Sequence, residues 1–362
     1  MNNKFNVKTN TFFINNLLLW HTRFNTRTMP WKNEKNPYKV WLSEIILQQT
    51  KVEQGLSYYL KFVKQFPKIG NLANASEDEV LKLWQGLGYY SRARNLHYTA
   101  KYISTELNGI FPNTYTEILK LKGVGEYTAA AISSFCFNEK KAVVDGNVKR
   151  VLSRYFLIKE AIDTTKGKKI FMDLAQQLIP NKNPGEYNQA IMDFGATVCK
   201  PKNPLCGSCM LKENCMAFNK NKVSQLPFKS KKIATKNRYF YSFFIETPKG
   251  YIIEQREEND IWKKLYQFPL VEFEKKKKLS NKEINKILAA KFDINNEEII
   301  EISKEFTQKL THQLIHIQFI SIKTTATTLL DKEKYRYTRN LTNFAFPKIF
   351  ILYLQSKSLI LE

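Results

Sequence analysis

Four of the five cysteines in this chain lie in one short stretch, CKPKNPLCGSCMLKENC, from residue 199 to residue 215. Their spacing, C-x6-C-x2-C-x5-C, places one close pair between two single cysteines. Structural zinc sites usually combine two close pairs, whereas a cubane iron–sulfur cluster takes one cysteine per iron. The spacing therefore favours an iron–sulfur cluster held by a loop, and a zinc knuckle is the alternative.

The fifth cysteine, Cys136, stands among apolar residues and is expected to be a small buried side chain. This cysteine usage does not fit the disulfide framework of a secreted protein. No apolar run approaches the roughly 20 residues that cross a bilayer. The first such run, Leu17 to Trp20, lacks the layout of a signal peptide. We expect a protein of the reducing cytoplasm, with no membrane partner.

Basic residues outnumber acidic ones, with 57 Lys and Arg against 33 Asp and Glu, so the formal net charge is +24. A polyanion is the natural partner of such a chain, and nucleic acid is a commoner one than a membrane surface. A lysine-rich composition that merely reflects the genome is the other explanation. The charge thus nominates DNA or RNA as the partner.

The 362 residues suffice for two domains, and the pattern of apolar residues changes once along the chain. Up to Phe218 they recur at three- and four-residue spacing, which predicts an all-α domain over residues 1–218. The lysine-rich residues 219–238 are expected to be a basic linker. Beyond it, two strands around a turn at 247–250, a helix at 281–292 and a strand at 312–323 predict an α+β domain over residues 239–362.

A phosphate-binding hairpin is predicted within LKLKGVGEYTAAAISSF, residues 119–135. The segment reads as a helix, a Gly-Val-Gly turn and a second helix, and Gly123 and Gly125 permit backbone conformations that other residues avoid. The unpaired amides at the start of the second helix can bind phosphate without reading the DNA sequence. An ordinary turn between two helices is the alternative.

Two acidic residues stand at notable positions in predicted helices. Glu44, in WLSEIILQQT, falls near the edge of an apolar helix face, where a solvated surface glutamate is the default interpretation. Asp145, in AVVDGNVKRVLSR, follows an apolar run and precedes a basic helix, so its context alone favours a helix N-cap over a catalyst. Neither position assigns a reaction without further information.

Taken in order, the hairpin, the aspartate and the cysteine loop resemble the helix-hairpin-helix DNA glycosylases, the superfamily of endonuclease III and MutY. WLSEIILQQT closely resembles the catalytic segment of MutY. The resemblance implies an all-α helix-hairpin-helix glycosylase domain with a [4Fe-4S] cluster loop, plus a C-terminal α+β Nudix-like domain. It also implies a monovalent cation at the hairpin. The cluster ligands would be Cys199, Cys206, Cys209 and Cys215.

The resemblance further implies a reaction, the hydrolysis of the N-glycosidic bond of adenine opposite 8-oxoguanine or guanine in double-stranded DNA. A departing adenine must be protonated, which a carboxylic acid kept neutral in a dry pocket can do, while an ionised carboxylate can stabilise the sugar cation. By resemblance, Glu44 protonates adenine at N7 and then activates water, Asp145 stabilises the cation, and Tyr127 holds both in register. We expect a monomer that repairs nucleoid DNA.

Tyr127 also distinguishes this chain from the strand-cleaving relatives, which carry a lysine two residues after the second hairpin glycine. A phenol cannot form the Schiff base that an amine forms, so a monofunctional glycosylase is expected. An endonuclease III-like glycosylase and lyase acting on oxidised pyrimidines is the alternative enzyme. A DNA-binding module without activity is a third hypothesis, and the presence of both Glu44 and Asp145 argues against it.

Further positions match residues that handle DNA in this superfamily. An enzyme that flips a base must fill the gap left behind, and Gln49 and Tyr89 match the residues that wedge beside the orphaned partner base. Without the resemblance they read as a surface amide and a helix-end aromatic. The other matches are Thr50 and Leu87 at the partner base, Lys32 and Gln189 in the adenine pocket, and Asn147 and Lys149 at the substrate.

The C-terminal region resembles the Nudix-like domain with which MutY recognises 8-oxoguanine. DIWKKLYQFPLVE matches its tryptophan and Phe-Pro landmarks but lacks the Glu-rich box of a pyrophosphohydrolase, so hydrolase activity is not expected there. In KLTHQLIHIQF, Leu310, Thr311 and His312 align with the loop that reads the oxidised base. A histidine at the start of a strand is otherwise more often structural.

Overall fold

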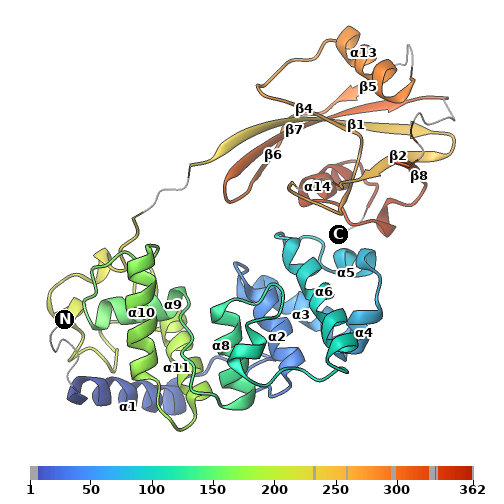
Figure 1. Ribbon diagram of the computed structural model, residues 1–362. Coiled ribbons are helices and arrows are strands. Elements are labelled where there is room, and N and C mark those ends of the chain that lie inside the picture. Colours follow the sequence, from blue (N-terminus) through green and yellow to red (C-terminus); the bar gives the residue numbers. More distant parts are fainter. Residues whose placement is uncertain are drawn as a thin grey trace. The chain divides into compact units, whose positions relative to one another are not determined.

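The computed structural model describes residues 7–230, 234–257, 260–294, 299–325, 331 and 333–360. The chain divides into two compact units: the first combines residues 1–74 with 98–231, and the second combines residues 75–97 with 232–362. The first unit is helical, and the second contains a β-sheet with helices (Figure 1). None of the described helices is both long and apolar enough to cross a membrane.

The helices of the first unit are joined by connections of different lengths, from a few residues to the cysteine loop of residues 198–215. They are α1 (Val7–Phe24), α2 (Pro37–Leu47), α3 (Val52–Gln65), α4 (Ile69–Asn74), α7 (Tyr115–Ile118), α8 (Glu126–Phe137), α9 (Gly146–Tyr155), α10 (Thr165–Leu178), α11 (Pro184–Thr197) and α12 (Met216–Asn219). A 3-10 turn, η1, spans Val223–Gln225, and α6 (Ser91–Glu106) crosses the boundary between the units.

The hydrophobic core of the first unit lies among α1, α9, α10 and α11. Phe13 and Leu17 of α1 pack there with Leu152 of α9, Phe171 of α10 and Phe194 of α11, and all five are almost fully buried. A second group of helices lies beside the first, with α2 packed against α3 and α8, and α8 in contact with α11 (Figure 1). Residues of both groups line one cavity.

Local sequence signals set the starts of the helices that border this space. α2 begins with Pro37 after Asn36, whose side chain accepts hydrogen bonds from the first free amides. α8 begins directly after Gly125. α9 begins after Asp145, which caps the helix with its carboxylate, so the predicted N-cap is confirmed.

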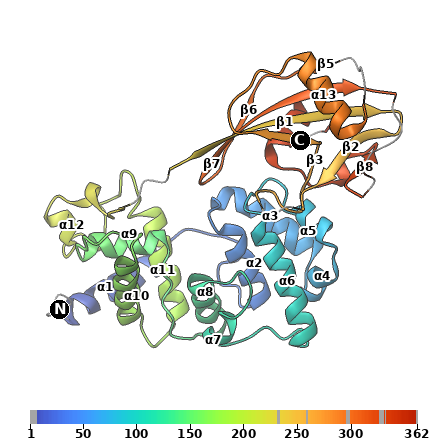
Figure 2. The same cartoon turned by 45° about the horizontal axis from the view of Figure 1, so that its top comes forward.

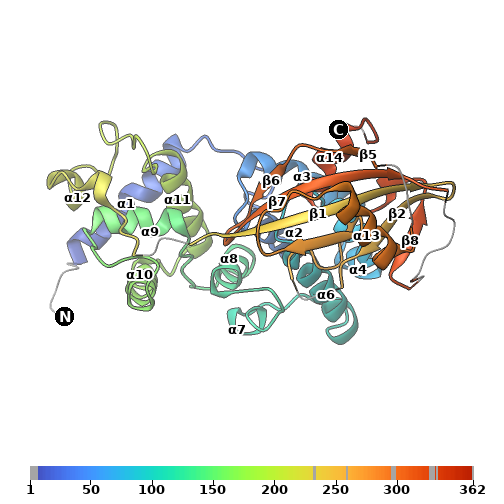
Figure 3. The ribbon, with the colours of Figure 1, turned by 90° about the horizontal axis from the view of Figure 1, so that it is seen from above.

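The described strands form one eight-stranded sheet in the second unit. They are β1 (Lys236–Thr247), β2 (Gly250–Gln255), β3 (Tyr266–Gln267), β4 (Leu270–Phe273), β5 (Ile299–Ile302), β6 (Phe306–Lys309), β7 (Gln313–Lys323) and β8 (Tyr335–Thr338). The helices are α5 (Glu77–Leu83), α13 (Asn281–Phe292) and α14 (Lys348–Ser356), with a 3-10 turn at Leu341–Asn343. The long strands β1 and β7 run parallel, side by side (Figure 3).

α13 lies over one face of the sheet (Figure 2), and α14 lies over the other (Figure 1). Phe243 and Ile320 share a core with Leu288 of α13. Phe319, next to Ile320 in β7, stacks on Tyr353 of α14 with ring centroids 4.0 Å apart. Neighbouring strand residues point to opposite faces of the sheet, so Phe319 and Ile320 of β7 pack against different helices.

The predicted β-hairpin is confirmed, with Thr247 opposite Gly250 in an antiparallel pair. Gly250 has φ +116, and a Cβ there would lie 2.4 Å from the carbonyl oxygen of Thr338, so glycine is required. The helix expected at 281–292 is α13, and the strand expected at 312–323 is β7. The predicted all-α and α+β classes of the two regions are therefore confirmed.

The segment expected to be a linker carries more structure than the sequence suggested. Arg154 donates hydrogen bonds from Nε to the carbonyl oxygens of Val223 and Leu226, at 3.0 and 3.1 Å. The amide of Ser230 donates to Asp163 at 2.9 Å. The chain therefore stays on the helical unit up to residue 230, and β1 already begins at residue 236; residues 231–233 lie outside the described residues.

Residues 75–97 belong to the second unit, which the sequence did not indicate. The hydroxyl of Tyr266 donates to a carboxylate oxygen of Asp78 at 3.1 Å, and Lys82 Nζ donates to the carbonyl oxygen of Phe344 at 2.9 Å. These contacts join segments that lie far apart in the chain.

Candidate active site

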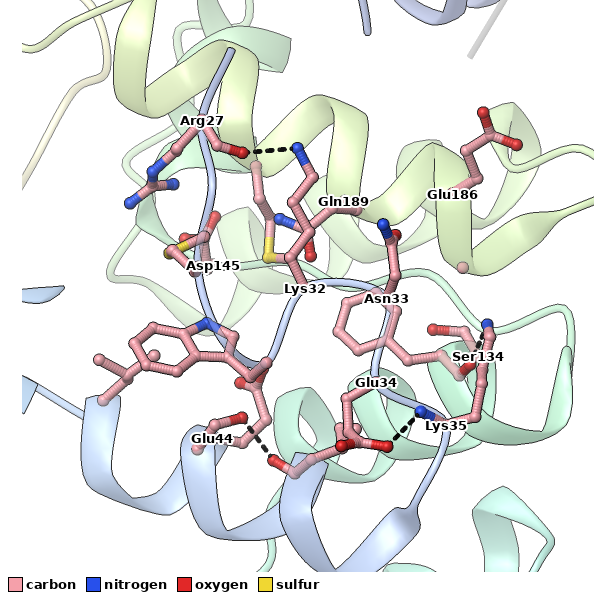
Figure 4. A pocket seen from close by; sticks show the side chains of 18 of the residues that line it. Arg27, Lys32, Asn33, Glu34, Lys35, Glu44, Ser134, Asp145, Glu186 and Gln189 are labelled. Carbon is pink, nitrogen blue, oxygen red and sulfur yellow. Dashed lines mark hydrogen bonds between the residues drawn. The ribbon is translucent and has the colours of Figure 1, made fainter. Parts of the chain in front are cut away.

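A cavity of about 750 Å³ lies in the helical unit (Figure 4). Its lining comes from the segment between α1 and α2, from α2, α8 and α11, and from the start of α9. The predicted site residues that line it are Lys32, Glu44, Thr50, Tyr127, Asp145, Asn147 and Gln189. Gln49, Gly123, Gly125 and Lys149 lie outside this lining. Folding thus brings residues from distant parts of the chain to one site.

Glu44 is carried by α2, and only 7% of its surface is exposed. Burial raises the pKa of its carboxyl to about 7; a hydrogen bond with the Tyr127 hydroxyl opposes the rise, and the charge of Asp145 adds to it. A carboxyl with this pKa is often protonated near neutral pH, so Glu44 can donate a proton to a group in the cavity. The interpretation of Glu44 as a solvated surface residue is wrong.

Asp145 reaches the same cavity from the N-terminus of α9. Its Oδ1 accepts a hydrogen bond from the Val148 amide at 2.7 Å, and its Oδ2 accepts one from the Asn147 side chain at 2.7 Å. Burial raises the pKa of the Asp145 carboxyl, while these two hydrogen bonds favour the ionised form and oppose the rise. The N-terminus of a helix also favours negative charge, so Asp145 is well placed to act as an ionised carboxylate held in one position.

Tyr127 lies in the first turn of α8 and is near enough to both carboxyls to feel their charges. Its hydroxyl is hydrogen-bonded to Glu44 and lies 3.7 Å from the sulfur of Met192. Burial raises its pKa well above the usual range, and the charges of Glu44 and Asp145 add to the effect. The phenol therefore stays neutral and can act as a hydrogen-bond donor to Glu44.

A chain of hydrogen bonds connects Asp145 to the cysteine loop. Asn147, which donates to Asp145, accepts a bond at Oδ1 from Arg150 Nη2 at 2.8 Å. The buried Arg150 also donates from Nε to the carbonyl oxygen of Cys199 at 2.7 Å. The sequence analysis missed Arg150; its place one turn after Asn147 on the same helix face is the signal that could have revealed it.

The four cysteines of the loop are half-buried free thiols. Arg154 donates to Cys199 Sγ at 3.4 Å. Burial raises the pKa of Cys209 to about 12, and it also raises the pKa values of Cys206 and Cys215. Thiols in such surroundings become thiolates when cations or a metal compensate their charge. Within the described part of the chain, no three His, Cys, Asp or Glu side chains are arranged to hold one metal ion.

Cys136 is less buried than expected. It lies in the last turn of α8, where the helix leaves the core, and is only half-buried. Burial nevertheless raises the pKa of its thiol to about 12, so it is not a reactive thiolate.

The hairpin contains one glycine with a left-handed backbone, not two. Gly123 has φ +81, in the region that favours glycine. Gly125 has φ −101 and caps α8 in an extended conformation, so the expectation that it needs a special backbone is wrong. A Cβ built on Gly125 would meet no atom within 4 Å beyond its chain neighbours, which leaves the first amides of α8 accessible to a phosphate.

Gln49 and Tyr89, the predicted wedge residues, have left-handed backbones with φ +56 and φ +48. Such values are uncommon outside glycine and concentrate at functional sites. Both side chains are exposed. The sequence contains no sign of this strain, because it depends on the turns that the folded chain imposes.

The second unit has a cavity of about 600 Å³ that gathers five further predicted residues. The predicted residues in its lining are Leu87, Tyr89, Leu310, Thr311 and His312. The hydroxyls of Tyr89 and Thr311 are hydrogen-bonded to each other. The structure therefore brings Leu87 and Tyr89, two of the four residues expected at the partner base, to the same cavity as the expected 8-oxoguanine loop. The other two, Gln49 and Thr50, belong to the helical unit.

Residues 42–179 match the family described as HhH-GPD superfamily base excision DNA repair protein. The adenine DNA glycosylase of Buchnera aphidicola subsp. Baizongia pistaciae is 42% identical over 319 residues, which cover 87% of this chain and 87% of that protein. The adenine DNA glycosylase of Mus musculus is 42% identical over 225 residues, which cover 60% of this chain and 44% of that protein.

Two solved structures share the fold of the helical unit. A thermostable thymine-DNA glycosylase has a TM-score of 0.54 at 28% identity and covers 59% of this chain and 98% of its own. Endonuclease III in a non-covalent DNA complex has a TM-score of 0.52 at 20% identity, covering 61% of this chain and 99% of its own. This last likeness concerns the fold alone and gives the pyrimidine-specific alternative no support. The extent of identity with the Buchnera enzyme shows that this chain belongs to the adenine DNA glycosylases, the base-excision repair enzymes that cleave the N-glycosidic bond of adenine.

Proposed function

We propose that the cavity of the helical unit hydrolyses the N-glycosidic bond of an adenine flipped out of double-stranded DNA, where it stood opposite 8-oxoguanine or guanine. The observation that carries this proposal is a pair of unlike carboxyls at one cavity. Glu44 has a pKa raised to about 7, whereas Asp145 is hydrogen-bonded through both oxygens. Two carboxyls with different environments can divide the roles of acid and anion.

In the proposed reaction, Glu44 gives its proton to adenine N7 as the bond between the sugar C1′ and adenine N9 breaks. The electron pair leaves with the base, and the negative charge of Asp145 stabilises the oxocarbenium-like sugar. Glu44, now a carboxylate, accepts a proton from the water that adds to C1′. Tyr127 supports this cycle because its hydroxyl is hydrogen-bonded to Glu44.

We assign the other cavity residues to binding. Lys32 and Gln189 contact the flipped adenine, Thr50 contacts the partner base, and Asn147 contacts the substrate together with Lys149, which lies outside the cavity lining. The cavity volume of about 750 Å³ falls within the range of small-ligand sites. Gln49 and Tyr89 fill the gap in the duplex, and the amides after Gly125, with a monovalent cation, bind phosphate.

We propose a monofunctional enzyme that acts as a monomer on chromosomal DNA in the cytoplasm. A lyase needs an amine that attacks the sugar as a Schiff-base nucleophile. At the start of α8 this chain has the neutral phenol of Tyr127. Among the described residues, the lysines that line the cavity with Asp145 are Lys32 and Lys35. Lys32 Nζ donates a hydrogen bond to one backbone carbonyl oxygen, and Lys35 Nζ donates a hydrogen bond to another.

We assign residues 1–218 to the glycosylase domain, 219–238 to a basic linker and 239–362 to a Nudix-like domain that recognises 8-oxoguanine. The fold adjusts these bounds, because residues 75–97 join the sheet unit and residues up to 230 stay on the helical unit. The gathering of Tyr89, Thr311 and His312 around one cavity supports this role. Hydroxyl and imidazole groups can bond to the polar edge of an oxidised purine. Leu87 and Leu310 would supply apolar contact to the same base.

Full-length wild-type protein is expected to excise adenine from duplexes with 8-oxoguanine or guanine opposite, and to leave the strand uncut until alkali is added. Replacing both Thr311 and His312 with alanine should slow excision opposite 8-oxoguanine by about tenfold, because about 1.4 kcal/mol of recognition corresponds to tenfold. The rate opposite guanine should stay the same. Single-turnover assays on the two duplexes give the ratio of the two excision rates. If this ratio is the same in the double variant and in wild type, the assigned role of Thr311 and His312 is wrong.

We propose that Cys199, Cys206, Cys209 and Cys215 hold a [4Fe-4S] cluster. A cubane binds each cysteine through its own iron, so the four sulfurs need not converge on a single ion. All four thiols lie close enough to influence one another electrostatically, and Arg154 and Lys212 supply positive charge beside them. The bound cluster would tie the loop, and the lysines on it, into a fixed surface for DNA phosphates.

Purified protein is expected to contain about four iron atoms and four sulfides per chain, as one cubane requires. Cys209→Ser should lose most of the iron and lower the unfolding temperature, because a ligand at a half-buried position is removed. Cys136→Ser is the matched control and should keep the full iron content, because Cys136 lies outside the loop. Elemental analysis decides the matter, and one zinc per chain without iron would contradict the proposal.

A further inference from the structure

Asp193 lies behind the wall of the active-site cavity and has no exposed surface. It belongs to α11, the helix that also carries the cavity residues Gln189 and Met192. A fully buried carboxylate is costly unless charged or polar partners compensate it. Its partners therefore indicate what the residue is for.

The described partners of the Asp193 carboxylate come from the segment between α1 and α2. Oδ1 accepts a hydrogen bond from Arg27 Nη1 at 2.8 Å, and Oδ2 accepts one from Asn25 Nδ2 at 2.8 Å. Lys32 Nζ lies 3.5 Å from Oδ2. Lys32 Nζ also donates to the carbonyl oxygen of Arg27 at 2.8 Å, which Figure 4 shows. One carboxylate thus holds three side chains together.

Arg27 and Lys32 both line the cavity, and the segment that carries them contains no helix or strand between residues 25 and 36. Their side chains are 26% and 14% exposed, so the cations lie close to the cavity and not in bulk water. A segment without regular structure depends on tertiary contacts for its position. Asp193, on a rigid helix, supplies these contacts.

The other charged groups at the cavity have partners elsewhere. Glu34 pairs with Lys39 at 3.3 Å, and Lys35 donates to the carbonyl oxygen of Phe135 at 2.7 Å. His21 is hydrogen-bonded to Asn25, and burial and the charge of Lys32 lower its pKa, so it adds little positive charge near neutral pH. Glu186, also in the lining, accepts a hydrogen bond from Asn183 Nδ2 at 3.4 Å. Asp193 is the carboxylate that pairs with Arg27 and Lys32 in the described part of the chain.

We propose that Asp193 is a positioning residue for adenine excision, which fixes Arg27 and Lys32 at the cavity wall and offsets their charge. This inference rests on the proposed function. An adenine that has taken a proton from Glu44 is cationic, and two uncompensated cations beside it would oppose its formation. The buried carboxylate lowers that opposition and keeps the Lys32 donor aimed at one place.

The test compares full-length wild type, Asp193→Asn, Lys32→Gln and the double variant in single-turnover excision. Affinity is measured separately on a duplex with a non-cleavable 2′-fluoro analogue of the adenine nucleotide. Asp193→Asn should slow excision by about 10²-fold, the loss that small misplacements at a site produce, with the dissociation constant within about threefold. In the double variant, which also removes the charge of Lys32, the excision rate should be about tenfold higher than in Asp193→Asn, because the effects of coupled residues are not additive.

Asp173→Asn is the matched control, since it makes the same exchange at an exposed position on α10 and should leave the rate unchanged. If Asp193→Asn does not fold, Asp193→Glu carries the same test, because it keeps the charge but displaces the cations, and about tenfold slower excision is expected. A rate within threefold of wild type, or an equal loss with and without Lys32, overturns the inference.

Glu44→Gln in the same assay separates this inference from the proposed function. If wild type excises adenine, Glu44→Gln does not, and Asp193→Asn equals wild type, only the role of Asp193 fails. If wild type leaves adenine in place, or Glu44→Gln retains activity, the proposed function itself fails.

Discussion

Glu44→Gln is expected to lower the single-turnover rate of adenine excision by about 10³-fold or more, while affinity for DNA with a mispaired adenine stays within about threefold. The amide matches the carboxyl in size and can still accept the Tyr127 hydrogen bond. It has no proton to give and cannot activate water. Excision under enzyme excess measures the rate, and the non-cleavable duplex measures the affinity.

Glu106→Gln, at an exposed position on α6, is the matched control and should match wild type. The wild-type rate should also fall as pH rises through about 7, because Glu44 then loses the proton that it must donate. The slope should approach tenfold per pH unit, as for one essential acid. Retained activity in Glu44→Gln, or a rate that rises across this pH range, would contradict the assignment.

Asp145→Asn is expected to slow excision by about 10²- to 10³-fold, the loss found when charge stabilisation of a transition state is removed. Asparagine is as good an N-cap as aspartate, so it can still accept the Val148 amide and the helix should be preserved. The loss should therefore appear in the rate and not in the unfolding temperature. This exchange separates the two roles that the sequence left open for Asp145.

Asp145→Ala completes the comparison, because it removes the cap together with the charge. It should be as slow as Asp145→Asn and also less stable by about 1 kcal/mol, the usual loss for a missing N-cap. Thermal unfolding and single-turnover excision are measured on both variants. If Asp145→Asn were fully active and only Asp145→Ala were impaired, the residue would be a cap without a catalytic role.

Much of the local structure followed from the chain's own patterns. The start of α13 was predictable because Ser280 and Glu283 form a capping box ahead of an apolar helical pattern. The β1–β2 hairpin was predictable because Gly250 accepts a backbone that other residues avoid. Parallel pairing of β1 with β7 was not, since the strands are separated by β2, β3, β4, α13, β5 and β6.

The site shows a similar division. Glu44, Asp145 and Tyr127 were recognisable through their motif positions, and the cavity contains all three. Asp193 was missed although it is a lone acid within the apolar run Ala190, Ile191, Met192 and Phe194. An acid at such a position looks like a surface residue until its partners, carried by a distant segment, are known.

The order of residues was enough to predict the two fold classes, the cysteine loop and the hairpin, because these depend on spacing within short stretches, and the type of chemistry followed from the resemblance of its motifs to a known family. Burial of Glu44, the left-handed turns at Gln49 and Tyr89, the anchoring of Arg27 and Lys32, and the place of residues 75–97 in the sheet unit required the folded molecule. The physical reason is that desolvation and pairing depend on neighbours in space, and these neighbours come from segments far apart in the chain.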